Sequence, residues 1–147
     1  TPQRLAAPQR NIHLIGIVIV AHGGLAREYL RAVEHVVGQQ AGIVTVEISY
    51  DHDRIAKEAE ICTAANTVDT GDGVVVVTDM FGGSPSNLSL AACNPANRMI
   101  LYGANLPLLI KLAKTRSLPL KAAVLGARDA GRKYMDARTV GQTGYEL

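Results

Sequence analysis

Two runs of apolar, mostly β-branched residues restrict the folds open to this chain. Residues 14–20 read LIGIVIV and residues 74–77 read VVVV. A strand with one face in water alternates apolar and polar residues, whereas both faces of these runs are apolar, as in parallel sheets covered by helices. Residues 43–50 (IVTVEISY) alternate in part, which predicts a strand nearer an edge, and residues 99–102 (MILY) predict a fourth strand.

Between the predicted strands, apolar residues recur with the spacing of a helix. Apolar residues from Leu25 to Val37 recur at three- and four-residue steps and end at Gly38, a typical residue after a helix. Further helices are predicted from Arg54 to Asn66 with Asp51 or Asp53 as cap, from Ser84 as N-cap with Pro85 at the first helical position, from Asn105, and from Pro119. This alternation predicts an α/β fold: an open, doubly wound, mainly parallel sheet with helices on both faces.

The composition fits one compact domain and disfavours several classes of protein. Of 147 residues, 48% are hydrophobic, and we expect one domain over residues 14–140, with 1–13 a flexible tail or artificial remnant and 141–147 a second tail. The formal charge is +2 without a cluster of basic residues, so no nucleic-acid partner is expected. No apolar run reaches the ~18 residues of a membrane span, and we expect a cytoplasmic protein without membrane insertion. Cys62 and Cys93 lie far apart without metal-ligand spacing, which favours reduced thiols.

Polar residues follow two of the predicted buried strands. His22 comes after the first run, in AHGG, and Asp79 follows the third strand. Functional residues of open parallel sheets collect at the carboxyl ends of the strands, so adjacent first and third strands would bring His22 and Asp79 together. A carboxylate bonded to one imidazole nitrogen fixes the tautomer and leaves the other nitrogen as a nucleophile. The pair therefore predicts a positioned histidine nucleophile.

A glycine-rich turn after Asp79 predicts an anion site. Gly82, Gly83 and Ser84 lead into a predicted helix N terminus, where backbone N–H groups and the helix dipole favour an anion. With the histidine and the carboxylate, the turn predicts phosphoryl transfer by positioning and electrostatics. Taken separately, an HGG and a GGS turn are more often structural. The predicted rim of the site comprises Gly23, Gly24, Phe81 and Asn105.

Other interpretations of the same residues compete with this site. Residues 82–86 nearly match the G-x-S-x-G turn of esterases, but Ser86 replaces the last glycine and no histidine follows His52. Neither glycine motif of nucleotide-binding proteins is present. His13 and His35 are interpreted as surface residues, whereas His52, in a turn between two aspartates, is the serious competitor of His22. For Arg27, a solvated helix face is favoured over a contact with phosphate or an acidic partner.

Three segments resemble the IIA component of the mannose-type sugar phosphotransferase system. They are AHGGLA at 21–26, VVVTDMFGGSPSN at 75–87 and ILYGANLPLLIKL at 100–112, in matching order and similar spacing. The resemblance implies that the phosphocarrier protein HPr phosphorylates His22, which passes the phosphoryl group to a IIB component without a metal or organic cofactor. It also implies that Asp79 orients His22 and that Gly82, Gly83 and Ser84 contact the phosphate.

The resemblance further implies strand order 2-1-3-4, an added antiparallel strand and a homodimer. Residues 132–140 (RKYMDARTV) either supply that strand, exchanged between subunits, or form a solvated tail. Gly24 stands where many relatives carry a large aromatic residue, and Phe81 where those of the DTWGGSP type carry a tryptophan. We expect these differences to alter the docking surface and to leave the phosphorylation chemistry intact. Two alternatives stay open: a regulatory phosphoprotein of the same cascade without sugar transport, and the distantly related phosphotransferase subunit serving dihydroxyacetone kinase, which fits the GGSPSN loop less well.

Overall fold

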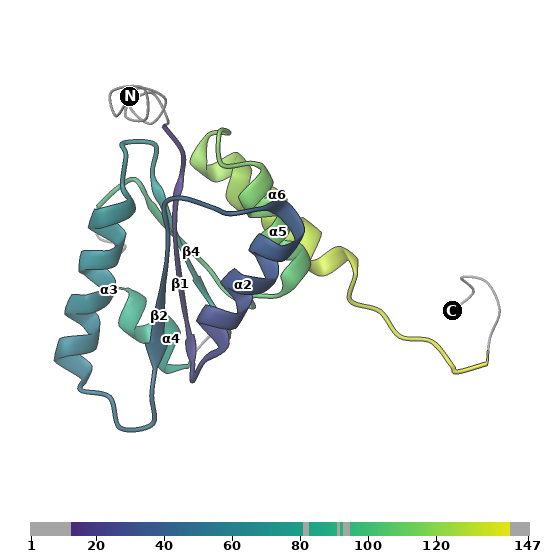
Figure 1. The fold of residues 1–147 in the computed structure, drawn as a ribbon, viewed down its shortest axis with the longest axis horizontal. Helices are drawn as coiled ribbons and strands as arrows, with labels where there is room; N and C mark the ends of the chain where they lie inside the picture. The colour runs from purple at the N-terminus through teal and green to yellow at the C-terminus, as the bar shows by residue number, and fades with distance from the viewer. Residues whose placement is uncertain (1–12, 81–82, 91, 93–94, 142–147) are drawn as a thin grey trace, which may run out of the picture.

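Strands and helices alternate along the chain as the sequence predicts (Figure 1). The computed structural model describes residues 13–80, 83–90, 92 and 95–141. In chain order the elements are β1 (Gly16–His22), α2 (Leu25–Val37), β2 (Ile43–Ile48), α3 (Arg54–Val68), β3 (Val74–Thr78), α4 (Ser84–Ser89), β4 (Arg98–Leu101), α5 (Leu106–Lys114) and α6 (Leu120–Lys133). Every strand and helix predicted from the residue pattern is present, so the predicted α/β class is confirmed.

The described strands form one parallel sheet in the order β2-β1-β3-β4, which confirms the order implied by the resemblance. β1 and β3 are central, and all their residues are buried except His22 at the end of β1. The long β-branched runs therefore occupy the positions that are covered on both faces. β2 lies at one edge, as its partial alternation predicts, and β4 lies at the other.

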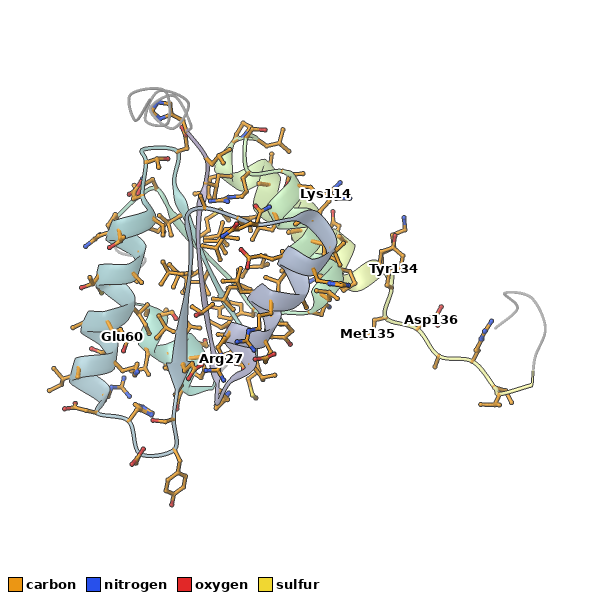
Figure 2. The ribbon with its side chains drawn as sticks, in the orientation of Figure 1. Arg27, Glu60, Lys114, Tyr134, Met135 and Asp136 are labelled. Carbon is orange, nitrogen blue, oxygen red and sulfur yellow. The ribbon has the colours of Figure 1, made fainter. Side chains whose placement is uncertain are left out.

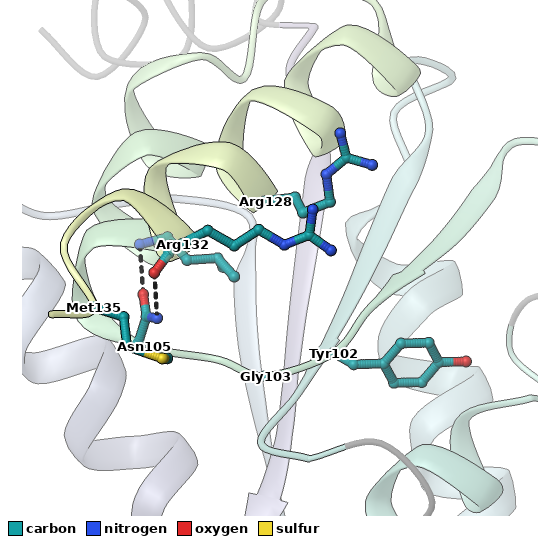
Figure 3. Close-up of a pocket in the computed structure, with 8 residues that line it drawn as sticks. Tyr102, Gly103, Asn105, Arg128, Arg132 and Met135 are labelled. Atoms are coloured by element: carbon teal, nitrogen blue, oxygen red, sulfur yellow. Dashed lines mark hydrogen bonds between the residues drawn. The ribbon is translucent and has the colours of Figure 1, made fainter.

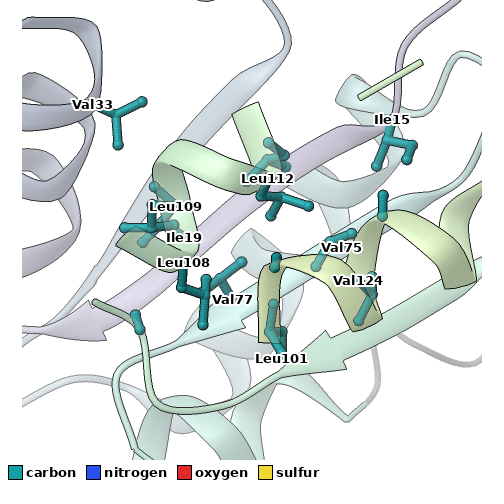
Figure 4. Close-up of a cluster of buried hydrophobic side chains, with 14 of the residues drawn as sticks. Ile15, Ile19, Val33, Val75, Val77, Leu101, Leu108, Leu109, Leu112 and Val124 are labelled. Atoms are coloured by element: carbon teal, nitrogen blue, oxygen red, sulfur yellow. The ribbon is translucent and has the colours of Figure 1, made fainter. Parts of the chain in front are cut away.

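Helices cover both faces of the sheet, with α2, α5 and α6 on one side and α3 and α4 on the other (Figure 1). Successive side chains of a strand point to opposite faces. Ile19 and Val77 therefore pack with Leu109 in the first layer (Figure 4), whereas Val18 packs with Ile61 in the second. None of the described helices is long and apolar enough to cross a membrane.

The close approach of α3 to β1 depends on Gly16. A Cβ atom at this position would collide with the carbonyl oxygen and side chain of Val68, the last residue of α3. Two of the four buried residues of α3, Ala64 and Ala65, are also small. The start of β1 thus lies close to the end of α3 because residue 16 has no side chain.

Polar side chains begin two of the helices as predicted, and a third prediction is wrong. Asp53 accepts bonds from the backbone N–H groups at the start of α3, and Asn105 accepts one from Leu108 N at 2.9 Å. Ser84 is not the N-cap of α4. Gly83 takes that place, because its carbonyl oxygen already accepts the first helical bond, from Asn87 N at 3.1 Å.

The amino ends of the strands are joined by a buried arginine. Arg116, only 4% exposed, follows α5 and donates to the carbonyl oxygens of Ile15 (2.8 Å), Gly42 (3.2 Å) and Ala41. Burial lowers the pKa of the Arg116 guanidinium. The side chain therefore ties the residues that precede β1 and β2 to the end of α5.

A second polar cluster at the same edge joins the end of α3 to the start of β4. Asp69 accepts hydrogen bonds from the backbone N–H of Gly71 (2.9 Å) and from the side chains of Asn97 (3.1 Å) and Arg98 (3.1 Å). Burial acts to raise the pKa of the Asp69 carboxyl, but these bonds and the Arg98 charge bring that pKa below its ordinary value. We call Arg116 and this cluster together the amino edge.

Beyond α6 the chain leaves the domain, with Met135 and Asp136 on the departing segment (Figure 2). Residues 135–139 have no regular structure and are exposed. In the described part of a single chain, the implied antiparallel strand is therefore absent. The segment buries no apolar side chain on its own domain, since Met135 and Val140 are both exposed. Its exchange between subunits stays a prediction.

Candidate active site

His22 and Asp79 meet at the carboxyl ends of the two central strands. β1 and β3 are neighbours in the sheet, and His22 ends the first while Asp79 follows the second. Oδ2 of Asp79 lies 2.8 Å from Nδ1 of His22 and accepts a second bond, at 3.0 Å, from the backbone N–H of the same residue. The carboxylate thus holds both the ring and the main chain of His22.

The two partners differ sharply in exposure. The Asp79 side chain is 10% exposed, whereas the His22 side chain is 47% exposed. Oδ1 of Asp79 is also buried, and it has no hydrogen-bond partner among the described residues. A buried carboxylate beside Nδ1 favours the tautomer with the proton on Nδ1. Nε2 then keeps its lone pair, and no described residue bonds to it.

Tyr29, on α2, is linked by hydrogen bonds to the residue before Asp79, and the sequence pattern did not predict this role. Its hydroxyl donates to the carbonyl oxygen of Ala104 at 3.1 Å, and Ala104 N in turn donates to Thr78 O at 3.0 Å, directly before Asp79. Burial raises the pKa of the Tyr29 phenol, and the negative charge of Asp79 raises it further. Helical periodicity alone makes Tyr29 an apolar core position, so its hydroxyl gave no sequence signal.

The turn before α4 approaches the imidazole closely. A Cβ atom on Gly83 would lie 3.4 Å from Cε1 of His22 and 3.1 Å from Cγ of Met80. The backbone of Gly83 therefore faces the ring edge without a side chain between them. Two other predicted site residues, Phe81 and Gly82, lie outside the described residues, as does Cys93.

His22 opens onto a shallow pocket of about 450 Å³ between the ends of β1 and β2. Gly23, Ser84, Tyr50 and His52 also line it. Gly23 has a φ of 55° and turns the chain there, and its N–H donates to Ile48 O at 2.9 Å. The Nδ1 of His52 lies 2.9 Å from Ser49 O, so it donates to that oxygen. The predicted competitor of His22 thus lines the same pocket.

Other predicted residues are placed elsewhere. Asn105 does not reach the pocket of His22, because its side chain caps α5 and donates to Gly131 O at 3.0 Å. Gly24 precedes α2 without lining the pocket. Arg27 pairs with Glu47 at 3.2 Å on the exposed surface, and the favoured interpretation of a solvated helix face stays a prediction. Within the described ranges, no group of three His, Cys, Asp or Glu residues is arranged to hold a metal ion.

Comparison with known proteins finds a family model that matches most of the chain. The model described as "PTS system fructose IIA component" (EIIA-man) matches residues 16–126. A curated relative, the PTS system mannose-specific EIIAB component of Escherichia coli, is 26% identical over 103 residues. That match covers 69% of this chain and 32% of the relative, so the chain spans about a third of the relative's length.

Solved structures with the same fold include two bacterial IIA proteins. The PTS IIA protein associated with the fucose utilization operon of Streptococcus pneumoniae is 27% identical, with a TM-score of 0.70 over 80% of this chain and 90% of that one. The mannose/sorbose-specific IIA subunit of Enterococcus faecalis has a TM-score of 0.78 over 89% and 99% of the two chains. At 18% identity, the second likeness shows the fold alone.

Proposed function

Since the chain belongs to the family of PTS system fructose IIA components, matched over residues 16–126, we propose that it is a phosphohistidine carrier. In this proposal His22 accepts a phosphoryl group from HPr in the cytoplasm and passes it to a IIB component of a mannose-type sugar phosphotransferase system. The protein is then a phosphotransferase whose own histidine is the covalent intermediate.

The contact between a half-exposed imidazole and a buried carboxylate carries the proposal. With the proton held on Nδ1 by Asp79, the Nε2 lone pair of His22 attacks the phosphorus of the donor phosphohistidine. The donor's P–N bond breaks as the new P–Nε2 bond forms, and the released electron pair stays on the donor ring. Positive charge that develops on the His22 ring is stabilised by the Asp79 carboxylate. Transfer to the acceptor repeats these steps with His22 as the leaving group.

Gly83 and Ser84 supply the contacts to the phosphoryl oxygens in this proposal, together with Gly82. Three observations support this role: the bare backbone of Gly83 beside the imidazole, the position of Ser84 on the pocket wall, and the start of α4 at Ser84. Backbone N–H groups at a helix start are donors without intrahelical partners. The phosphoryl group would therefore receive hydrogen bonds on the side of the ring that faces the turn.

Exposed apolar side chains near His22 support a protein as phosphoryl donor. Tyr50 lines the pocket, Met80 follows Asp79 directly, and Leu25 begins α2 just after the histidine turn; all three are exposed. Aromatic residues and methionine are enriched in protein interfaces. A small-molecule donor would leave these side chains in water, whereas a docked HPr or IIB would cover them.

We extend the proposal to a homodimer. The outer edge of β4 has no strand beside it in the described part of the chain, and the exposed residues 135–139 lead away from the domain (Figure 1). An unpaired edge readily accepts another strand. Exchange of this segment between subunits predicts a dimer in light scattering that a chain ending at Tyr134 fails to form. A monomeric full chain would contradict this assembly.

A regulatory phosphoprotein without sugar transport is the second candidate. The same fold occurs in a protein described as a sigma-54 interaction domain protein of Enterococcus faecalis, at a TM-score of 0.65 and 13% identity, which shows the fold alone. The two roles share the chemistry at His22 and differ in the acceptor. Genes for membrane IIC and IID components beside the gene for this chain would favour transport, and their absence from the genome would favour regulation.

The proposal is tested by incubating the protein with phosphoenolpyruvate, enzyme I and HPr. Intact mass and peptide mapping at neutral or alkaline pH, where phosphohistidine survives, should find one phosphate on His22. Omission of HPr should prevent labelling. If folded protein receives no phosphate from an HPr that is itself shown to be phosphorylated, the proposed donor is wrong.

A further inference from the structure

The α5–α6 hairpin concentrates the positive charge of the molecule. Residues 106–133 contain seven Lys or Arg and one Asp, whereas residues 13–105 contain five Lys or Arg against ten Asp or Glu. The near-neutral total charge conceals this uneven distribution, because the residues before the hairpin are acidic on balance and the hairpin is basic.

Two of these basic residues line a small pocket at the end of β4 (Figure 3). Arg128 and Arg132, one turn apart on α6, project toward the same opening, with Tyr102 across from them. The pocket measures about 230 Å³ and shares no lining residue with the pocket of His22. β3 separates β4 from β1 in the sheet, so the two pockets are distinct sites.

The wall of this arginine pocket is fixed by tight packing between α5 and α6. Asn105 accepts a bond from Leu108 N at 2.9 Å and donates to Gly131 O at 3.0 Å (Figure 3). A Cβ atom on Gly131 would lie 3.0 Å from the Leu108 side chain, so α6 comes this close only with glycine there. The helix turn that carries both arginines is thereby held in place before any ligand arrives.

Among the described residues, few carboxylates compensate the positive charge in the pocket. Arg128 pairs at 3.1 Å with Asp129, but these side chains are 42% and 66% exposed, where an ion pair is weak. Arg132 has no carboxylate partner among the described residues. Like charges four residues apart on a helix repel each other. An anion between the two guanidinium groups would remove this repulsion.

We propose that the arginine pocket binds the phosphate group of a small phosphorylated metabolite. Two guanidinium groups match the charge of a phosphate monoester, which is close to −2 at neutral pH, and their N–H groups suit bidentate contacts to phosphate oxygens. The volume leaves room beside the phosphate for a body of a few carbon atoms, packed against the Tyr102 ring. The site serves binding and plays no part in phosphoryl transfer at His22.

An NMR titration of the ¹⁵N-labelled protein tests this proposal, with glycerol 3-phosphate as the probe and succinate as a carboxylate comparator. Saturable shifts are expected at the amides of Tyr102, Gly103 and Arg132, with weaker binding of succinate. The double variant Arg128→Gln/Arg132→Gln should bind at least tenfold more weakly. The matched variant Lys114→Gln/Lys121→Gln removes the same charge from the same hairpin outside this pocket and should bind normally.

Three outcomes would overturn the proposal. Shifts confined to Gly23, Gly83 and Ser84 would place the phosphate at the pocket of His22 instead. An equal loss of glycerol 3-phosphate affinity in the two double variants would mean that the phosphate is attracted to the overall charge of the hairpin and not to this pocket. Succinate binding as tight as that of glycerol 3-phosphate would show that the pocket takes carboxylates. Each variant's amide spectrum reports directly whether the fold is retained.

Discussion

Charged side chains lie at the amino edge of the sheet and also at its carboxyl edge, where His22 and Asp79 lie at the ends of the central strands. The side chains at the two edges differ in how many hydrogen bonds they make and in how exposed they are. At the amino edge, Arg116 donates to three main-chain carbonyl oxygens and Asp69 accepts from three residues. At the carboxyl edge, Asp79 is buried, while the histidine it holds is 47% exposed and bonded through one ring nitrogen only, as far as the chain is described.

This difference separates a structural role from a chemical one. A polar group that is bonded on several sides fixes neighbouring segments and has little left to offer a ligand. A ring that is held on one nitrogen and open at the other is positioned and still able to react. Substitutions at the two edges should therefore affect different measurements: phosphoryl transfer at the carboxyl edge and stability at the amino edge.

The largest expected effect is the loss of phosphorylation in His22→Ala. The substitution removes the only proposed nucleophile, while the half-exposed ring contributes little to the core, so the melting temperature should stay close to that of the parent. His52→Ala is the matched control, because His52 lines the same pocket. Labelling by HPr that persists in His22→Ala and disappears in His52→Ala would reverse the assignment.

Asp79→Asn should slow transfer from HPr by a factor on the order of 10²–10⁴. The amide keeps the shape of the carboxylate but favours the wrong tautomer of His22 and removes the charge that stabilises the phosphorylated ring. Single-turnover kinetics with phosphorylated HPr measure this change. Asp69→Asn is the control at the amino edge and should leave the rate unaltered. Equal rates for Asp79→Asn and the parent would remove the orienting role.

Arg116→Ala should lower the free energy of unfolding by about 3 kcal/mol, because it removes a buried side chain that donates to main-chain carbonyl oxygens. The buried carbonyl oxygen of Ile15 and that of Ala41 lose their side-chain donor, whereas that of Gly42 keeps a bond from Ile17 N at 3.1 Å. Urea unfolding measures the loss, and Arg31→Ala, at an exposed arginine, should change stability by less than about 0.5 kcal/mol. Phosphoryl transfer from HPr to folded Arg116→Ala should be normal. A loss of transfer without a loss of stability would contradict the purely structural role of the amino edge.

The smallest expected effect concerns the pH dependence of the amino edge. The pKa of Asp69 in the folded protein is lowered, chiefly by hydrogen bonds that overcome the effect of burial. Its stabilising contribution is therefore present above the ordinary aspartate pKa of about 3.9 and is lost as the pH falls through the lower folded value. The stability difference between the parent and Asp69→Asn should shrink from pH 7 to pH 3. A constant difference would contradict this.

The sequence predicts the strands, their order and the family, and all three are confirmed. The two β-branched runs identify the central strands because only fully covered strands are apolar on both faces. The meeting of His22 with Asp79 also follows from sequence, since each comes after one of two adjacent parallel strands.

Other features depend on packing between segments and had no local signal. The Tyr29 hydroxyl donates to Ala104, 75 positions away in the sequence. The helical spacing of apolar residues predicts that the Tyr29 ring is buried, but it does not predict a partner for the hydroxyl. The position of Asn105 after a strand suggests a site residue, but its side-chain amide donates a hydrogen bond to the carbonyl oxygen of Gly131 in α6. The arginine pocket exists only because α6 packs beside the end of β4. Such contacts follow from the tertiary arrangement rather than from spacing along the chain.

The role of Asp79 in orienting His22 is tested directly by ¹⁵N NMR of the histidine side chains before and after phosphorylation. We expect unphosphorylated His22 to carry its proton on Nδ1, and the phosphoryl group to be attached to Nε2 with Nδ1–H retained. A phosphoryl group on Nδ1 of His22, or a neutral ring with its proton on Nε2, would contradict the role of Asp79 on which the mechanism rests.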